Sequence, residues 1–527
     1  MFTLFRKKPW ALEGLTQPDC ELPSAYEQIR IGKLEPLPDE ELVASKGKLR
    51  WVDGAMDGVF GHFSPGADQK KRIFIAVSAV QKLEHDSRNE FLQELFKLTS
   101  QESLLSIIDP VLEELEKDSK LENRIRLAAI GRYFATRFGR REAVKFGLAL
   151  LGAFGSKEDS EIAKILGKND EFTLYAAVAA VRLSMHPEQD LWEMAKNVQG
   201  WGRVQIVRRL KDTQNEEIRA WMLRDGFRND VMNEYLACIC ARAGHLHEAL
   251  ARKFVDQSLL GGAADIIQAL IAGGPAEDID DYEHAAEVCE TYLNLIWSRP
   301  ANGLNHLLTV LRLRDFLADA PSWEKRLAAS WTEPQRERMK TICESIATRE
   351  TWKPLLAEAL ASANEQEFFE GDQVAQTLGI DTWEIHFKRV KDSPISSSSW
   401  YRLMKQTDET RIEDVLGFAE SVLPLEQIET GPGDELGLGP AFQLHGVLDL
   451  ILQDLPRFPN RGWRFIKAGL SSPVVRNRNM AIRALASWPR TSWADEMQTL
   501  VQRAWDAEPN KDVKQRFESL LAGTTIS

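Results

Sequence analysis

The residues most able to bind a metal ion are two cysteines and two histidines within ten positions: Cys238, Cys240, His245 and His247. Zinc sites are usually built from four such ligands that converge on one ion. In a helix, however, residues two positions apart point about 200° away from each other, because the helix turns once in 3.6 residues. Cys238 and Cys240 therefore cannot face one ion unless the helix breaks between them. We expect buried small side chains followed by a turn, and no metal site.

A second candidate combines an aromatic residue with a carboxylate, Trp221 and Asp225, which lie four positions apart on one face of a predicted helix. This pairing is similar to that of the HEAT-like DNA glycosylases, and the similarity would imply action on a nucleotide at a concave surface. The structural alternative is that Trp221 belongs to the core and that Asp225 closes the helix before Gly226. We expect the structural alternative, since the spacing identifies no second aromatic platform.

Familiar enzyme signatures are absent from the sequence. It contains no glycine-rich phosphate loop ending in Lys-Ser or Lys-Thr, no His-Glu-x-x-His and no Gly-x-Ser-x-Gly. It also lacks a dinucleotide-binding fingerprint and a haem-type cysteine motif. We therefore expect no cofactor and a binding protein more than an enzyme. Catalysis by residues that converge only in the fold stays open as an alternative.

Charge is distributed unevenly, and the C-terminal region holds the clearest basic segment. Residues 456–490 contain eight arginines and lysines and no aspartate or glutamate. Apolar stripes (Trp463, Ile466 and Leu470; Ala481, Leu485 and Trp488) are expected to be buried, which would leave the cations to solvent or to an anionic partner. The residues predicted to bind that partner are Arg461, Arg464, Lys467, Arg476, Arg478 and Arg483. The alternative is that these arginines bridge to carboxylates of a neighbouring helix pair.

Other segments suggest further contact surfaces. Residues 124–145 are mainly basic and residues 277–290 mainly acidic, so a partner could be recognised by complementary charge. Of the 15 tryptophans most should fill the core. We expect Trp10 and the Trp400-Tyr401 pair to contact a partner.

The elements that must position these residues are helices. From about residue 68 to 521 apolar residues recur with a period near 3.6, and short polar or Gly/Pro breaks separate the segments. Strand-like alternation is nearly absent. Before residue 66 prolines interrupt every pattern except 39–48. Consecutive helices pair over 124–138 with 141–154, 172–184 with 191–198, and 204–210 with 216–224.

Two segments carry repeat-like patterns. Residues 477–485 (Asn-Arg-Asn-Met-Ala-Ile-Arg-Ala-Leu) resemble the second helix of a HEAT repeat, although Asn477 stands where an apolar residue is usual. Residues 234–250, with Gly244 at a tight turn and Ala249-Leu250 on the returning helix, are similar to a tetratricopeptide hairpin. The resemblance implies an all-α fold, an α-solenoid of stacked antiparallel helix pairs after a short irregular N-terminal segment, and no particular activity. Glycine- and serine-rich interruptions divide the chain into 1–66, 67–275, 276–435 and 436–527.

Bulk properties narrow the class of protein. The 527 residues carry a formal charge of −13, which disfavours general nucleic-acid binding. Five cysteines are too few for a disulfide framework, and no apolar run is long enough to span a membrane. We expect a soluble cytoplasmic scaffold or adaptor without a membrane partner. A protein partner is the leading expectation, and nucleic acid bound through the basic segments is the alternative.

Overall fold

The computed structural model of the chain is helical throughout the part that it describes, which is residues 10–18, 22–43, 51–60, 69–101, 103, 105–117, 120–300, 302–319, 321 and 323–524. Within these ranges it has 31 α-helices and no strand, and the one isolated β-bridge joins Glu435 to Val474. None of the helices in the described ranges is long and apolar enough to cross a membrane. The predicted all-helical fold class is therefore confirmed.

The chain divides into two compact units, Met1–Thr351 and Trp352–Ser527. The sequence-based boundaries after residues 66, 275 and 435 stay predictions. Helices of the first unit are, in order, α1 (Ala25–Arg30), α2 (Glu40–Val43), α3 (Ala55–Phe60), α4 (Gln69–His85), α5 (Asn89–Gln101), α6 (Ile108–Lys117), α7 (Leu121–Arg137), α8 (Arg141–Phe154), α9 (Ser160–Leu166), α10 (Thr173–Leu183), α11 (Pro187–Ala195), α12 (Trp201–Arg209), α13 (Glu216–Trp221), α14 (Glu234–Ala243), α15 (Leu246–Ala251), α16 (Gln257–Ala272), α17 (Ala285–Trp297), α18 (Leu304–Ala318), α19 (Trp323–Ala329) and α20 (Glu333–Ala347).

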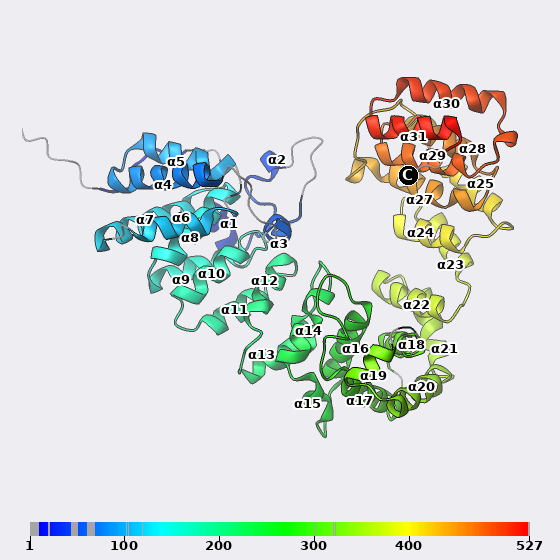
Figure 1. The fold of residues 1–527 in the computed structure, drawn as a ribbon, viewed down its shortest axis with the longest axis horizontal. Helices are drawn as coiled ribbons and strands as arrows, with labels where there is room; N and C mark the ends of the chain where they lie inside the picture. The colour runs from blue at the N-terminus through cyan, green and yellow to red at the C-terminus, as the bar shows by residue number, and fades with distance from the viewer. Residues whose placement is uncertain are drawn as a thin grey trace, which may run out of the picture. The chain divides into compact units, whose positions relative to one another are not determined.

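Helices α8, α10, α12, α14, α16, α18 and α20 of this unit pack in a row, each against the next (Figure 1). Helices α7, α9, α11 and α15 each pack beside a member of the row. The predicted helices match α7 and α8, α10 and α11, and α12 and α13, with shifted ends. Helix α7 packs on α8 and α10 on α11 as expected, whereas α12 packs mainly on α10, α11 and α14. A π-helical turn, Met222–Gly226, extends α13, and α1 was not predicted.

Helices α7 and α8 cross in close contact. Phe134 of α7 and Leu148 of α8 are fully buried, as are most residues of the apolar stripes around them. Glycine makes the close approach possible, because a Cβ at Gly147 would press on the backbone nitrogen of Ala135 and lie 2.8 Å from the carbonyl oxygen of Gly131. Interior packing at this density leaves no room for an added methyl group.

The second unit contains α21 (Trp352–Ala361), α22 (Glu365–Thr377), α23 (Trp383–Asp392), α24 (Ser397–Gln406), α25 (Ile412–Val422), α26 (Leu425–Ile428), α27 (Gln443–Asp454), α28 (Trp463–Leu470), α29 (Val475–Ala486), α30 (Asp495–Ala507) and α31 (Lys511–Ala522). Its core runs from Trp383 to Leu520 and includes both stripes predicted for 463–488, with Trp463 only partly buried. Trp400 is fully buried, so the expectation that it contacts a partner is wrong; Tyr401 is 40% exposed. Trp10 donates from Nε1 to the carbonyl oxygen of Leu83 at 3.0 Å.

We expect Gly147→Ala to lower the free energy of unfolding by several kcal/mol, on the order of the cost of overpacking a core at backbone. Gly417 on α25 is the matched control, because a Cβ there meets nothing within 4 Å. Gly417→Ala should be neutral or stabilise by up to about 1 kcal/mol through helix propensity. Urea unfolding followed by circular dichroism measures both. Equal stability of the two variants would contradict the close crossing.

Candidate functional site

Among the basic residues of the C-terminal segment, Arg478 on α29 is fully buried. Its Nε lies 2.7 Å from Oε2 of Glu508 and its Nη2 lies 2.8 Å from Oε1 of the same carboxylate, while Nη1 donates to the carbonyl oxygen of Ser472 at 2.8 Å. A buried guanidinium is tolerated only when it is paired and hydrogen-bonded in this way. The prediction that Arg478 binds a partner is therefore wrong, since the residue joins α29 to the end of α30.

The other cations of this segment stay at the surface, but most are paired. Arg461 lies 2.5 Å from Glu413, Arg464 pairs with Glu420, and Arg476 lies 3.0 Å from Asp449. These carboxylates belong to α25 and α27, which precede the acid-free segment. Residues 456–490 contain no carboxylate of their own, but carboxylates of α25 and α27 lie beside their arginines at the surface. Lys467 and Arg483 form no ion pair with any residue in the described part of the chain.

Trp221 and Asp225 flank a buried arginine. Arg203 of α12 is 1% exposed, its Nη1 lies 3.3 Å from Oδ2 of Asp225, and its Cζ lies 5.8 Å from the centre of the Trp221 ring. Trp192 meets Trp221 edge to face, with ring centres 6.4 Å apart. Both candidate residues therefore contact a cation inside the fold. Trp221 is only partly buried and the π-helical turn continues through Gly226, so neither the core position nor the helix end that we expected is found, and a nucleotide-processing site stays an untested alternative.

The two cysteines of α14 are buried, whereas His245 and His247 at the start of α15 are partly exposed. Cys238 and Cys240 are buried in α14, and burial raises the pKa of the Cys238 thiol to about 12. His247 stacks on His284, with ring centres 3.6 Å apart. Across the described ranges no group of three or more His, Cys, Asp or Glu side chains is placed to hold a metal ion.

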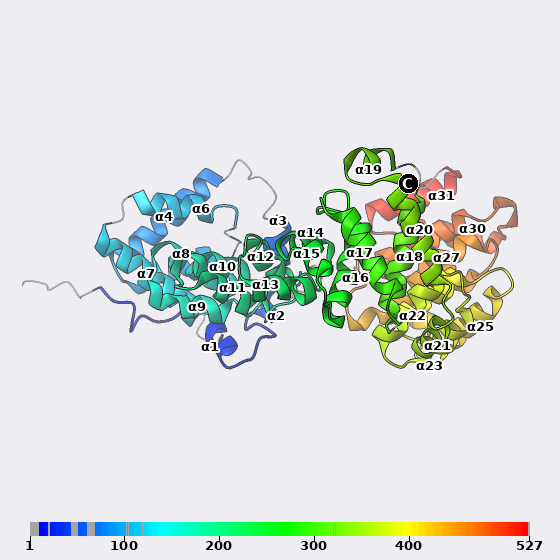
Figure 2. The same cartoon turned by 90° about the horizontal axis from the view of Figure 1, so that it is seen from below.

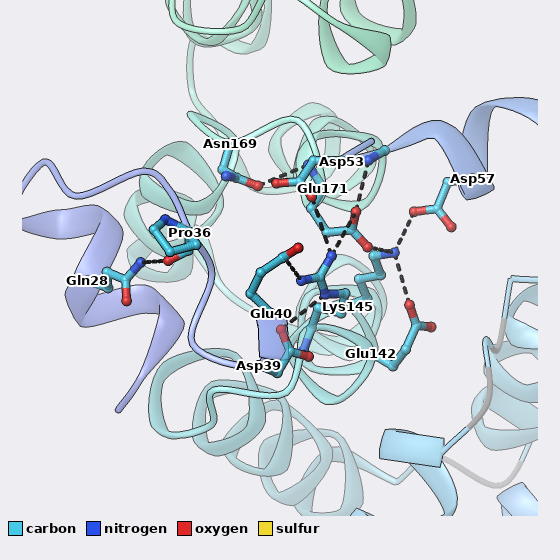
Figure 3. Close-up of polar contacts among 12 residues, drawn as sticks. Gln28, Pro36, Asp39, Glu40, Asp53, Asp57, Glu142, Lys145, Asn169 and Glu171 are labelled. Atoms are coloured by element: carbon cyan, nitrogen blue, oxygen red, sulfur yellow. Dashed lines mark hydrogen bonds and ion pairs between the residues drawn. The ribbon is translucent and has the colours of Figure 1, made fainter. Parts of the chain in front are cut away.

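The densest cluster of charged groups was not predicted and lies on α8 (Figure 3). Arg141 is 6% exposed; its Nε lies 3.1 Å from Oδ1 of Asp39, and its Nη2 lies 2.9 Å from Oε2 of Glu40. Asp53 lies 3.4 Å from Nη1. Asp39, Glu40 and Asp53 of the N-terminal segment are therefore held at α8 by charge. The sequence pattern did not predict these ion pairs, because Arg141 and its partners are about a hundred positions apart in sequence.

Lys145, one turn further along α8, completes the cluster. Its ammonium lies 2.6 Å from Glu171, 2.8 Å from Asp57 and 3.0 Å from Glu142, and only 2% of the side chain is exposed. Carboxylates outnumber the two cations here. Burial raises the pKa of Asp57 to about 6, and Lys145 only partly offsets this. The cluster is a clamp between α8 and the N-terminal segment.

A groove of about 520 Å³ in the first unit is lined by residues of α6, α8, α10 and α12. Helix α6 packs on α4 and α8, so it stands on one side of α8, and α10 and then α12 follow on the other (Figures 1 and 2). Small residues of α8 form the floor: Ala149, Gly152 and Ala153. Leu112 and Leu174 add apolar side walls. Small floor residues leave space that an incoming side chain can fill.

An apolar stripe on α10 continues this groove. Leu174, Val178, Val181 and Met185 follow one another at intervals of four, three and four residues, which is the spacing of a helix that packs along another helix. Val178 is 41% exposed, Val181 50% and Met185, two residues after α10, 63%. No other described helix covers this stripe fully.

The two sides of the groove carry opposite charge. Asp109 and Glu113 of α6 lie on one side, and Arg182 of α10 and Arg209 of α12 lie on the other. None of these four side chains forms an ion pair with a residue that the structure describes. Burial, and next the positive charge of Arg208, lower the pKa of Arg209. Sequence reasoning missed this site, although residues 194–211 contain five basic residues and no acid.

Comparison of the chain with models of known protein families, with curated proteins and with solved structures found no match.

We expect Arg478→Ala to destabilise the second unit by about 3–5 kcal/mol, because it leaves the buried carboxylate of Glu508 without its partner. Arg483→Ala, on the same helix but exposed, should change stability by no more than about 0.5 kcal/mol. Chemical unfolding of both variants tests the difference. A similar small effect at both positions would show that Arg478 is not a structural strut.

The raised pKa of Asp57 predicts a pH dependence. Between about pH 4, the unfolded value, and about pH 6, the folded carboxyl holds a proton that the unfolded chain has lost. This group therefore lowers the free energy of unfolding as the pH rises through that interval, and the loss persists above it. Asp57→Asn should remove this contribution, so its stability relative to the parent chain should increase from pH 4 to pH 6. A relative stability that stays constant in thermal melts over this range would contradict the assignment.

Proposed function

We propose that this chain is a helical-repeat scaffold, an α-solenoid of stacked helix pairs, which binds an amphipathic helix of a partner protein in the groove between α6 and α12. The observation that carries the proposal is the exposed stripe on α10. Its residues have the spacing with which one helix packs on another, and they border a groove with a small-residue floor. Exposed apolar stripes of this kind are typical of helix-binding grooves.

The partner's class follows from the charge of the groove. Phosphate chains avoid carboxylates, and the wall formed by Asp109 and Glu113 faces the groove. The pairing of Arg461, Arg464 and Arg476 with carboxylates likewise reduces the positive charge available to nucleic acid on α28 and α29. An amphipathic protein segment can pack its apolar face on the groove floor and pair its charged side chains with both walls.

The lining also favours binding over catalysis. Among the described residues that line the groove there are carboxylates, two arginines and Tyr175, and no histidine, cysteine or serine. This set provides no nucleophile paired with a general base. The cysteines at 238, 240, 289 and 343 are buried free thiols, which supports our proposal of a reducing compartment, the cytoplasm.

A peptide-display library screened on the full chain tests the proposal. Peptides selected by the parent chain should lose at least about tenfold in affinity when Val178→Asp and Val181→Asp are combined, because a charge is then placed against an apolar face. Both valines are exposed, so the variant should fold normally. Ala149→Leu with Ala153→Leu, which fills the floor, should have the same effect.

Phe369→Asp is the matched control, because Phe369 is 46% exposed on α22 of the second unit. It should leave peptide binding unchanged. If selection yields no peptide, or if the selected peptides bind the valine variant as tightly as the parent chain, the groove is not the binding surface. Binding of single-stranded oligonucleotide that the groove variants abolish would assign the site to nucleic acid instead.

A further inference from the structure

Arginines of the first unit commonly bridge from one helix pair to a carboxylate of the next. Arg132 pairs with Asp159, Arg224 with Asp256 at 2.7 Å, and Arg228 with Asp265 at 2.5 Å. Arg203 and Arg242 form similar bridges. These ion pairs follow the stacking of the helices; Arg203 is buried, and the other four arginines are partly exposed.

Arg182 and Arg209 depart from this rule. Neither has a carboxylate within ion-pair distance in the described part of the chain, and neither does the adjacent Arg208. The Nη1 of Arg209 donates to the backbone carbonyl oxygen of Gln205 at 2.7 Å and to its side-chain Oε1 at 3.3 Å, which supplies hydrogen bonds but no negative charge. A partly buried guanidinium beside a second cation is unfavourable without an anion, and the lowered pKa of Arg209 expresses this cost.

We propose that Arg182 and Arg209 form a carboxylate-binding subsite for an acidic side chain of the bound partner helix, an assignment that rests on the proposed function. Arg182 and Arg209 line the same groove from adjacent helices. Planar guanidinium groups bind carboxylates through paired N–H donors, and such bonds strengthen where water is excluded. A carboxylate of the bound helix neutralises the two arginines, which have no carboxylate partner in the described part of the chain.

The opposite wall fixes the orientation of that helix. Asp109 and Glu113 stand one helical turn apart on α6, across the floor from the arginines. The partner helix therefore has an apolar face with an acidic flank toward α10 and α12 and a basic flank toward α6. A helix that runs through the groove in the opposite direction, with its apolar face still on the floor, would place like charges against both walls, at a cost of several kcal/mol in general for such contacts. The groove is selective for one orientation.

The test uses a groove-binding peptide from the display selection and its copy in which flank glutamates are replaced by glutamine. The parent chain should bind the glutamate peptide about tenfold or more tightly than the glutamine copy at low salt. Arg182→Gln combined with Arg209→Gln should bind both peptides equally and with the affinity that the parent shows for the glutamine copy. Arg182→Gln alone, at an exposed position, is the second variant and should remove part of the preference.

Arg483→Gln is the control, because Arg483 is an exposed arginine that also lacks an ion pair in the described ranges, and it should keep the full preference. Selected peptides that need Val178 and Val181 but carry no acidic flank would overturn the subsite and leave the proposed function standing. So would a glutamate preference that survives in the double arginine variant. If no peptide depends on the valines, both proposals fall. Displacement of the peptide by an oligonucleotide, lost on Arg182→Gln and Arg209→Gln, would identify the site as a phosphate site.

Discussion

The fold depends on neutralising the cations that helix stacking buries. Taking a guanidinium or ammonium out of water costs several kcal/mol unless a carboxylate meets it with good geometry. Arg478, Arg203 and Lys145 are each nearly or fully buried, and each meets a carboxylate from another helix or segment. Such pairs add little net stability but make other arrangements of the helices costly. The ion pairs therefore help to specify which helix lies beside which.

The clamp on α8 shows the same constraint at higher density. Arg141 and Lys145 collect carboxylates from the N-terminal segment, from α8 and from the segment before α10. The acids outnumber the bases in this clamp, and burial, with a smaller effect of the neighbouring carboxylates, raises the pKa of Asp57 although Lys145 lies beside it. Charge therefore helps to hold in place a segment that prolines keep out of long helices, beside buried apolar residues such as Ile29 and Leu37.

Where this neutralisation is incomplete, the exception is informative. In the part of the chain that the structure describes, the arginines at the α10–α12 side of the groove lack the carboxylates that their counterparts in neighbouring helix pairs have, and no other helix fully covers the apolar stripe beside them. The arginines without carboxylate partners and the incompletely covered apolar stripe therefore lie beside the same groove. A single amphipathic helix with an acidic flank would supply both, which is why we propose the groove, and not the basic C-terminal segment, as the binding surface.

The sequence by itself determined the helical class, the positions of helices such as α7, α8, α10 and α29, and the apolar stripes around Leu470 and Leu485. These depend on residues within about one or two turns of each other, which a period of 3.6 reveals. Which carboxylate each arginine or lysine pairs with was decided only by the tertiary structure. Arg478 meets Glu508 thirty positions away and Arg141 meets Asp39 across 102 positions, so an acid-free segment was mistaken for an acid-free surface. Coulomb interactions act through space, and the distances that govern them exist only after the helices have stacked.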